Sequence, residues 1–175
     1  METEKLYFFT ATILEWKPLL KEDVFKDIIM DSLEFLVTKK RNLLKAFVIM
    51  PNHIHLMWNI LTPNNPSDVQ RDFLKYTLQQ IITQLKKRND TFWFEQLLVK
   101  AGDRYYQVWE WRPLAIELYT PDVKFQKLKY IHHNPIQERW QLCKLPEEYK
   151  YSSAGFYYMT KTDWSFLTHY LEYGM

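Results

Sequence analysis

The segment LLKAFVIMPNHIHLMWNIL, residues 43–61, contains two apolar runs on either side of the dipeptide Pro51-Asn52. Leu43–Met50 is almost continuously apolar, which is typical of a central strand with both faces buried. Pro51-Asn52 is a turn signal, so His53–Leu61 is expected to be a second strand. The two strands are predicted to form a β-hairpin.

The segments around this hairpin show the periodicities of a strand and two helices. Leu6–Leu14 is rich in Tyr, Phe, Thr and Ile and is predicted to be a strand. Apolar residues at helical spacing predict a helix over Val24–Leu36. A second helix is expected to begin at Ser67 or Asp68, either of which could serve as its N-cap, and to end near Lys87.

The second half of the chain adds a strand and a helix. Gln107–Leu118 is predicted to be a strand bent at Pro113, and Thr120 precedes a proline that opens a helix expected to end near Pro135. Residues 89–106 and the tail carry no clear pattern.

The predicted order is strand, helix, strand, strand, helix, strand, helix. This order indicates the α+β class, with a ferredoxin-like antiparallel sheet and helices packed on one face. The length of 175 residues and the lack of an internal linker predict a single domain over residues 1–175, with a C-terminal tail from about residue 146 packed on it.

Composition excludes several classes of function. Only three glycines are present, which disfavours the glycine-rich loops that bind nucleotide phosphates. The net charge of +2 is small, so the overall charge does not by itself indicate a nucleic-acid partner. The single cysteine, Cys143, can form neither an internal disulfide nor a cysteine-rich zinc site. The sequence shows neither a leader peptide nor a long apolar run, so a cytoplasmic protein without a membrane partner is expected.

His53 and His55 are the first candidate site residues. Residues two apart on a strand point to the same face, so their imidazoles should lie side by side while Ile54 points into the core. Two imidazoles on a rigid strand could form half of a metal site. The alternative is a pair of histidines on a solvent-exposed face.

Tyr130 and Asn134 are the second pair. Positions i and i+4 of a helix share one face, so the phenol and the amide should project together. On its own such a pair could serve only core or interface packing. A helix that docks over the histidine strand would instead supply two nitrogens and one amide oxygen to a divalent cation, Mg²⁺ or Mn²⁺, which could orient a phosphodiester for attack by the tyrosine hydroxyl.

The motifs Val48–Leu56 and Tyr130–Pro135 together resemble those of the single-tyrosine HUH transposases, and in particular the REP-associated tyrosine transposases. The resemblance extends over almost the whole chain, including Phe73–Thr77, the segment around Trp109 and Tyr151–Ala154. It implies the HUH endonuclease fold, in which His53 and His55 are metal ligands, Asn134 is the third ligand and Tyr130 is the nucleophile. Its implied substrate is single-stranded DNA with a hairpin, cut to leave a 5′-phosphotyrosine and a free 3′-OH.

Two segments depart from this family's pattern. Trp111–Leu114 lacks the histidine that is common in relatives, and Ile136–Trp140 replaces a more basic segment that contains glycine. His132 and His133 lie off the face of Tyr130, where either a packing or capping role or a contact to the site or to phosphate is expected.

Three functions remain open at this point: an active transposase, a catalytically inactive DNA-hairpin-binding regulator, and a replication initiator, which usually has a longer chain. A homodimer and a monomer are both compatible with the family. The candidate DNA-binding residues are Lys39, Lys40, Arg41, Lys75, Lys86, Lys87, Arg88 and Arg104, although such cations also occur at solvated helix ends.

Overall fold

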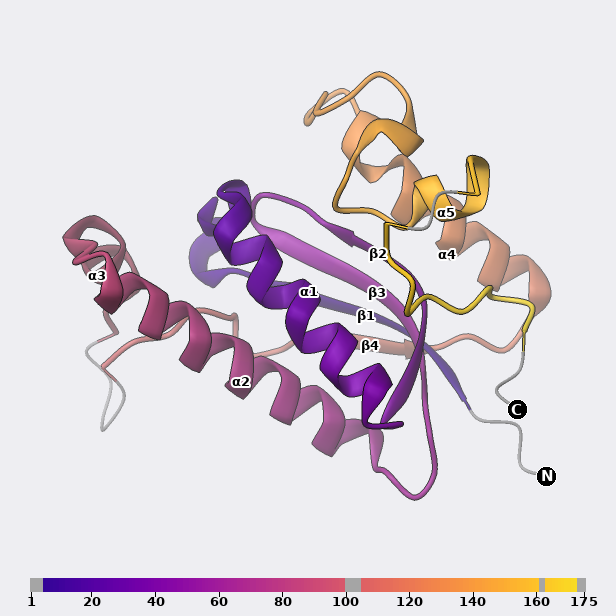
Figure 1. The fold of residues 1–175 in the computed structure, drawn as a ribbon, viewed down its shortest axis with the longest axis horizontal. Helices are drawn as coiled ribbons and strands as arrows, with labels where there is room; N and C mark the ends of the chain where they lie inside the picture. The colour runs from indigo at the N-terminus through magenta and orange to yellow at the C-terminus, as the bar shows by residue number, and fades with distance from the viewer. Residues whose placement is uncertain (1–4, 100–104, 161–162, 173–175) are drawn as a thin grey trace.

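The fold is built on one antiparallel sheet. The computed structural model describes residues 5–99, 105–160 and 163–172, and within these ranges the sheet has four strands. The strands are β1 (Leu6–Thr12), β2 (Asn42–Ile49), β3 (His53–Ile60) and β4 (Leu114–Glu117), in the order β2-β3-β1-β4 (Figure 1). This is the ferredoxin-like strand order, so the predicted α+β class and sheet topology are confirmed.

The predicted hairpin joins β2 and β3. The Met50 amide donates to the His53 carbonyl at 2.8 Å, which closes the turn at Pro51-Asn52. The expectation that the apolar run of β2 is a central strand is wrong, because β3 and β1 occupy the centre and β2 is at the edge.

The C-terminal segment explains why an edge strand is so apolar. It runs along β2, where the Ile49 amide donates to the Tyr151 carbonyl at 2.9 Å and the Ser153 amide donates to the Phe47 carbonyl at 3.0 Å. Farther along, the Thr168 amide donates to the Leu44 carbonyl at 2.9 Å. The segment also contains the short helix α5 (Ala154–Tyr158). An edge strand exposes unpaired backbone groups, and here the tail covers them.

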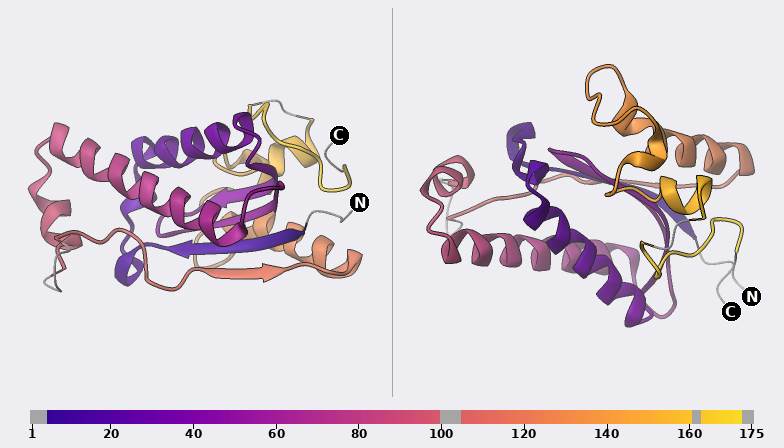
Figure 2. Two further views of the ribbon diagram at one scale, coloured as in Figure 1. Left: turned by 90° about the horizontal axis from the view of Figure 1, so that it is seen from below. Right: turned by 45° about the horizontal axis from the view of Figure 1, so that its top comes forward.

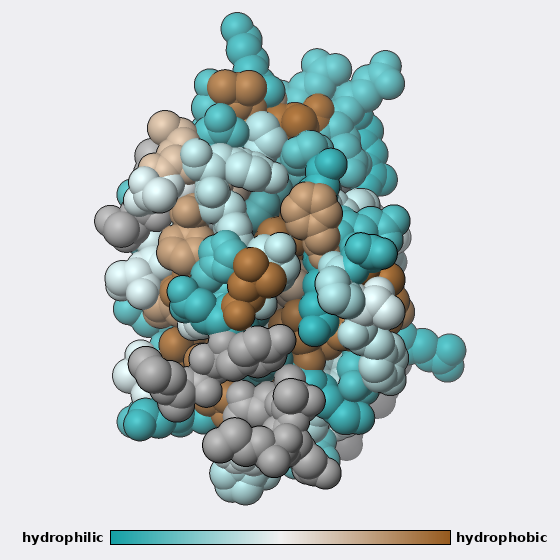
Figure 3. All heavy atoms as spheres, turned by 90° about the vertical axis from the view of Figure 1, so that its right-hand side faces the viewer, coloured by the Kyte–Doolittle hydropathy of each residue, from teal (hydrophilic) through white to brown (hydrophobic). Residues whose placement is uncertain are grey.

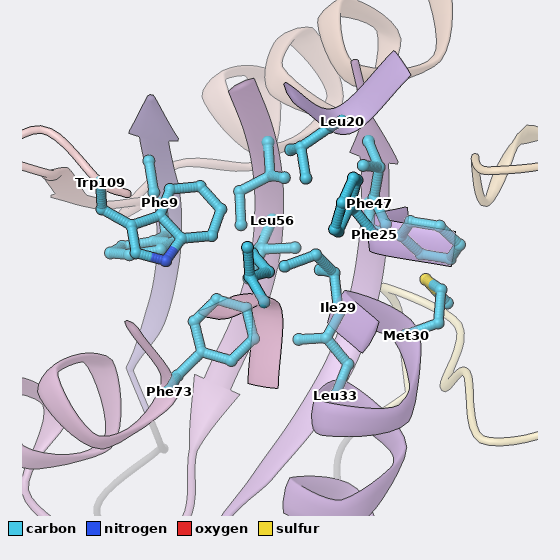
Figure 4. Close-up of a cluster of buried hydrophobic side chains, with 14 of the residues drawn as sticks. Phe9, Leu20, Phe25, Ile29, Met30, Leu33, Phe47, Leu56, Phe73 and Trp109 are labelled. Atoms are coloured by element: carbon cyan, nitrogen blue, oxygen red, sulfur yellow. The ribbon is translucent and has the colours of Figure 1, made fainter. Parts of the chain in front are cut away.

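Two long helices cover one face of the sheet. In α1 (Asp23–Thr38) the apolar residues recur at helical spacing, and in α2 (Pro66–Lys87) they do the same, so both helices bury one side. Their side chains form the main core with Phe9, Leu56 and Trp58 of the sheet (Figure 4). The N-cap of α2 is Asn65, whose side chain accepts from the Ser67 amide at 2.9 Å. The predicted caps, Ser67 or Asp68, therefore lie two or three residues inside the helix.

A third helix covers the opposite face. In α4 (Pro121–His133), Leu128 and Ile131 pack on Val48 and Met57 of the sheet. The expectation of helices on one face therefore holds for α1 and α2 but not for α4 (Figure 2). The reason is the alternation of strand side chains: β2 and β3 present apolar residues on both faces, and both faces need a cover.

The stretch before α4 differs most from expectation. The strand predicted over Gln107–Leu118 is interrupted: Trp109 pairs with Ile13 at an isolated bridge, and regular pairing with β1 occurs only in the four residues of β4. The Trp109 indole points toward α2 and donates to the Thr77 hydroxyl at 3.0 Å. The unassigned stretch before it contains the helix α3 (Thr91–Leu97), capped by Asp90, whose carboxylate accepts from the Trp93 amide at 3.0 Å.

Figure 3 shows hydrophobic side chains distributed among hydrophilic ones over the face that it presents. Among the described residues, none of the helices combines the length and the hydropathy needed to cross a membrane.

Phe73 of α2 provides a test of this core. Its ring lies 5.8 Å from Trp58 and 6.5 Å from Phe9, and it is 1% exposed. Replacement of Phe73 by alanine should lower the free energy of unfolding by about 3–5 kcal/mol, as measured by urea denaturation. The matched change at Phe35, which is 55% exposed on α1, should cost less than about 0.5 kcal/mol. Equal losses in the two variants would contradict the assigned core.

Candidate active site

His53 and His55 form a buried imidazole pair on β3. Their ring centroids are 4.7 Å apart, and the residues are 4% and 5% exposed. Ile54 between them is fully buried in the core on the opposite face. The two rings therefore lie side by side as the alternation predicts, and the alternative of a solvent-exposed pair is wrong.

Asn52 fixes the tautomer of His53. The Asn52 Nδ2 atom donates to the Trp16 carbonyl at 3.2 Å, and a carbonyl can only accept, so Oδ1 must point the other way. That oxygen lies 2.7 Å from His53 Nδ1. Because an amide oxygen cannot donate, Nδ1 carries the proton, and Nε2 is left with a free lone pair.

His55 is held by two neighbours from β1. Its Nδ1 is hydrogen bonded to the Thr10 hydroxyl at 2.7 Å, and Phe8 stacks on the ring with centroids 5.2 Å apart. The Nε2 atom is buried and has no partner among the described residues. Buried polar atoms are paired in the great majority of cases, so this nitrogen is a candidate metal-ligating atom.

Both imidazoles are held neutral. Burial, and secondarily the charge of Arg139, lowers the pKa of His53 to about 4. Burial also lowers the pKa of His55 to about 3, with smaller contributions from neighbouring groups, of which His53 is the largest. A protonated imidazole cannot bind a metal, so these environments keep both side chains in the ligating form at neutral pH.

Helix α4 brings Tyr130 over this pair. The helix begins after Thr120, whose hydroxyl accepts from the Val123 amide at 3.3 Å. Tyr130 lies with its ring centroid 5.2 Å from that of His55 and 6.1 Å from that of Phe8, and the residue is 39% exposed. A phenol from a late helix and an imidazole from a distant strand thus converge, and the phenol is accessible from solvent.

Asn134 follows one helical turn after Tyr130. Its backbone is still helical, with φ −56° and ψ −47°, so the two side chains share a face of the helix. Asn134 is fully buried, and both polar atoms of its amide have no partner among the described residues. An unpaired buried amide is costly unless something binds it.

These atoms fit a divalent cation. Among the described residues, no group of three or more His, Cys, Asp or Glu side chains could hold a metal. The free Nε2 atoms of His53 and His55 with the Oδ1 atom of Asn134 provide two nitrogens and one oxygen. Imidazole and carbonyl-type oxygen are both accepted by Mn²⁺, and the remaining positions would be open to substrate oxygens.

His132 serves packing. It is fully buried, its Nε2 is hydrogen bonded to the Ser153 hydroxyl at 2.8 Å, and its ring lies 5.0 Å from that of Tyr157. Burial, followed by the influence of His133, lowers its pKa to about 3. His132 therefore joins α4 to the C-terminal segment as a neutral residue, whereas His133 is exposed.

Two cations near the site were not predicted. The Lys127 amine lies 4.6 Å from the Phe8 ring and 5.7 Å from the Tyr130 ring. The Arg139 guanidinium lies 5.8 Å from the Trp140 ring, whose centroid is in turn 5.8 Å from that of His53. The spacing of Lys127 and Tyr130, three residues apart on a helix, could have revealed the first of these cations.

The predicted DNA-binding cations lie elsewhere. The described ones lie in α2 or directly after α1 or α2, the two helices that cover the face of the sheet opposite α4. Arg41 forms an ion pair with Asp72 at 3.0 Å, and Arg88 pairs with Glu22 at 2.8 Å, so these two have structural partners. The other described members are Lys39, Lys40, Lys75, Lys86 and Lys87, which are exposed. Arg104 lies outside the described residues.

The ferredoxin-like sheet carries an imidazole pair beneath a tyrosine-bearing helix, which is the arrangement that the resemblance implied. Comparison with solved structures agrees. The chain is similar to a REP-associated tyrosine transposase bound to a REP hairpin, with a TM-score of 0.63 and 14% identity over 95% of this chain and 84% of the other. The expected resemblance in fold is therefore confirmed, and the fold is that of the HUH transposases.

A second similar structure is a putative transposase from Deinococcus radiodurans R1, with a TM-score of 0.47 and 17% identity over 73% of this chain and 88% of the other. No family model and no curated protein matches the sequence.

Proposed function

We propose that the chain is a metal-dependent transposase that cleaves and rejoins single-stranded DNA through a 5′-phosphotyrosine. The observation that carries this proposal is the convergence of Tyr130 from α4 with His53 and His55 from β3 on one side of the sheet. Core packing alone explains neither the partly exposed tyrosine nor the buried Nε2 of His55 and the buried amide of Asn134, which have no partner among the described residues.

In the proposed site, His53, His55 and Asn134 hold Mg²⁺ or Mn²⁺. When bound, the cation neutralises charge on the phosphoryl oxygens and orients the phosphodiester for in-line attack. The Asn52 amide keeps the His53 ring in its ligating tautomer, and the Thr10 hydroxyl, hydrogen bonded to Nδ1, holds the His55 ring in its orientation. Such supporting contacts are typical of metal-binding histidines.

Tyr130 performs the covalent step. Its hydroxyl oxygen bonds to phosphorus, its proton passes to water, and the bond from phosphorus to the 3′ oxygen breaks. The 3′ oxygen leaves with a proton as a free hydroxyl. Attack of a 3′-OH on the phosphotyrosine reverses these steps and rejoins DNA. One phosphodiester replaces another, so no nucleotide hydrolysis is needed, which agrees with the scarcity of glycine.

Lys127 and Arg139 are proposed to contact the DNA backbone at this site. Both are near the imidazole pair, and neither forms an ion pair among those found in the described residues. Cations next to the reacting phosphate would offset its charge and steer DNA toward Tyr130.

The proposed DNA partner is a hairpin with an unpaired extension. The similar structure is of a transposase bound to a REP hairpin, and the shared fold makes the same class of DNA the first substrate to test. Light scattering of the protein with and without the hairpin distinguishes a monomer from the homodimer that the family leaves open.

A labelled hairpin oligonucleotide with single-stranded flanks tests the proposal. After incubation with protein and Mn²⁺, a denaturing gel should show a covalent protein–DNA band, and EDTA should prevent its formation. Hairpin binding without an adduct in either Mg²⁺ or Mn²⁺ would contradict the enzyme and favour the alternative, a catalytically inactive hairpin-binding regulator.

The lowered pKa values predict the pH dependence of metal binding. Protons compete with the metal for Nε2, so affinity falls as pH drops through the pKa of the ligand. Because His53 and His55 have pKa values of about 4 and 3, Mn²⁺ affinity should be constant from about pH 8 to about pH 5 and fall below that. The electron paramagnetic resonance signal of free Mn²⁺ measures this. A loss of affinity centred near pH 6.5 would instead indicate solvent-exposed imidazoles.

A further inference from the structure

Two tryptophans from separate loops flank His53. Trp16, the last residue of the short helix η1 (Leu14–Trp16), has its ring centroid 6.4 Å from that of His53. Trp140, which follows the short helix η3 (Asn134–Ile136), has its ring centroid 5.8 Å from the same imidazole. Neither indole is needed to explain the metal site or the nucleophile.

Trp16 is presented outward by a strained backbone. Glu15 and Trp16 have φ values of 54° and 58°, a region that costs energy for residues with a side chain and is an outlier for a bulky one. The conformation is held in place, because Glu110 accepts from the Glu15 amide at 2.6 Å and Asn52 donates to the Trp16 carbonyl. The residue is nevertheless 63% exposed, so the strain does not serve burial.

Trp140 sits on the other loop beside a cation. The guanidinium of Arg139 lies 5.8 Å from its ring, and the Trp140 amide donates to the Gln137 carbonyl at 2.8 Å. Its indole Nε1 is buried and has no partner among the described residues. This loop is the segment that departs from the basic pattern of the related transposases.

We propose that Trp16 and Trp140 form a binding site for an unpaired nucleobase next to the phosphodiester held at His53. An indole face stacks on any base, and Arg139 is placed to meet the adjoining phosphate. The Asn52 side chain joins the Trp16 carbonyl to His53 Nδ1, so the stacking surface and the imidazole are held in register. This inference rests on the proposed function, because it places the base relative to the reacting phosphate.

The groove between α2 and residues 106–113 supplies the control. It is lined by Lys75 and Trp111 among others, and Trp111 is 60% exposed, much like Trp16. Trp111 therefore has an exposure similar to that of Trp16 but lines the groove beside α2.

Binding is measured by fluorescence anisotropy in EDTA, which separates recognition from cleavage. The probes are one labelled hairpin with a single-stranded extension and the same hairpin without it. Trp16→Ala should raise the Kd for the extended hairpin by about 5- to 150-fold and leave the other unchanged. Trp16→Phe should retain most of the affinity, Trp140→Ala should behave as Trp16→Ala, and Trp111→Ala should match the wild type. Circular dichroism melting checks that each variant is folded.

An abasic scan of the extension then locates the base. One abasic position should weaken binding by the wild type but not by Trp16→Ala, since the contact is already absent in that variant. The inference is overturned if Trp16→Ala binds both hairpins like the wild type, or if it loses affinity for both equally. Adduct formation by the wild type in Mn²⁺ is scored separately, so the proposed function can fail while the base-binding site stands, and the reverse.

Discussion

Replacement of Tyr130 by phenylalanine should reduce formation of the covalent protein–DNA product by at least about 10³-fold while leaving hairpin binding intact. The variant keeps the ring that contacts His55 and Phe8 and removes only the hydroxyl. Tyr130 is partly exposed, so its loss leaves no buried polar partner, and stability should be unaffected. A denaturing gel measures the adduct, and anisotropy measures binding.

Tyr119 provides the matched control. It lies just before α4, the helix that carries Tyr130, and is 76% exposed. Tyr119→Phe therefore also removes one tyrosine hydroxyl. This variant should form the adduct at the wild-type rate. Persistence of the adduct in Tyr130→Phe would assign the nucleophile to another residue.

Replacement of His53 by alanine should lower the rate of cleavage by more than about 100-fold, since even residues that only support a metal ligand typically contribute 10- to 100-fold. The expected cause is the loss of one of the two imidazole donors, which weakens metal binding and leaves the phosphate less well oriented. Hairpin affinity in EDTA should be retained, because that binding does not involve the metal.

The same variant separates the metal site from general destabilisation. The Mn²⁺ concentration needed for half-maximal cleavage should rise in His53→Ala, whereas His133→Ala, which removes an exposed imidazole from α4, should behave as the wild type. Cleavage by His53→Ala at the wild-type rate and with the same Mn²⁺ dependence would remove His53 from the metal site.

Local sequence patterns predicted the hairpin and the helices that bury one side against the sheet. The turn signal at Pro51-Asn52 corresponds to the hairpin, and the helical spacing in α1 and α2 corresponds to the faces that these helices bury. The position of β2 at the sheet edge could not be predicted, because its apolar character depends on residues 151–168, which are distant in sequence. Likewise the bond of the Trp109 indole to Thr77 joins two residues 32 positions apart, so local periodicity does not reveal it.

In the candidate site, too, relations within one element were predicted from the sequence, whereas positions set by loops were not. Spacing alone placed His53 beside His55 and Tyr130 on the face of Asn134, since these relations are set within one strand and one helix. The resemblance to transposases predicted that the two pairs would converge. Trp16 and Arg139 escaped prediction because their positions depend on loop backbone conformations, including the positive φ of Trp16, that no periodicity encodes.

Peptide mapping of the covalent product by mass spectrometry tests the central claim most directly. Trypsin cuts after Lys129 and Arg139, so Tyr130 begins a peptide of residues 130–139. After nuclease trimming, this peptide should carry a 5′-phosphonucleotide, with the added mass on Tyr130. A phosphonucleotide on any other residue, or DNA that is cut without one on this peptide, would contradict the account.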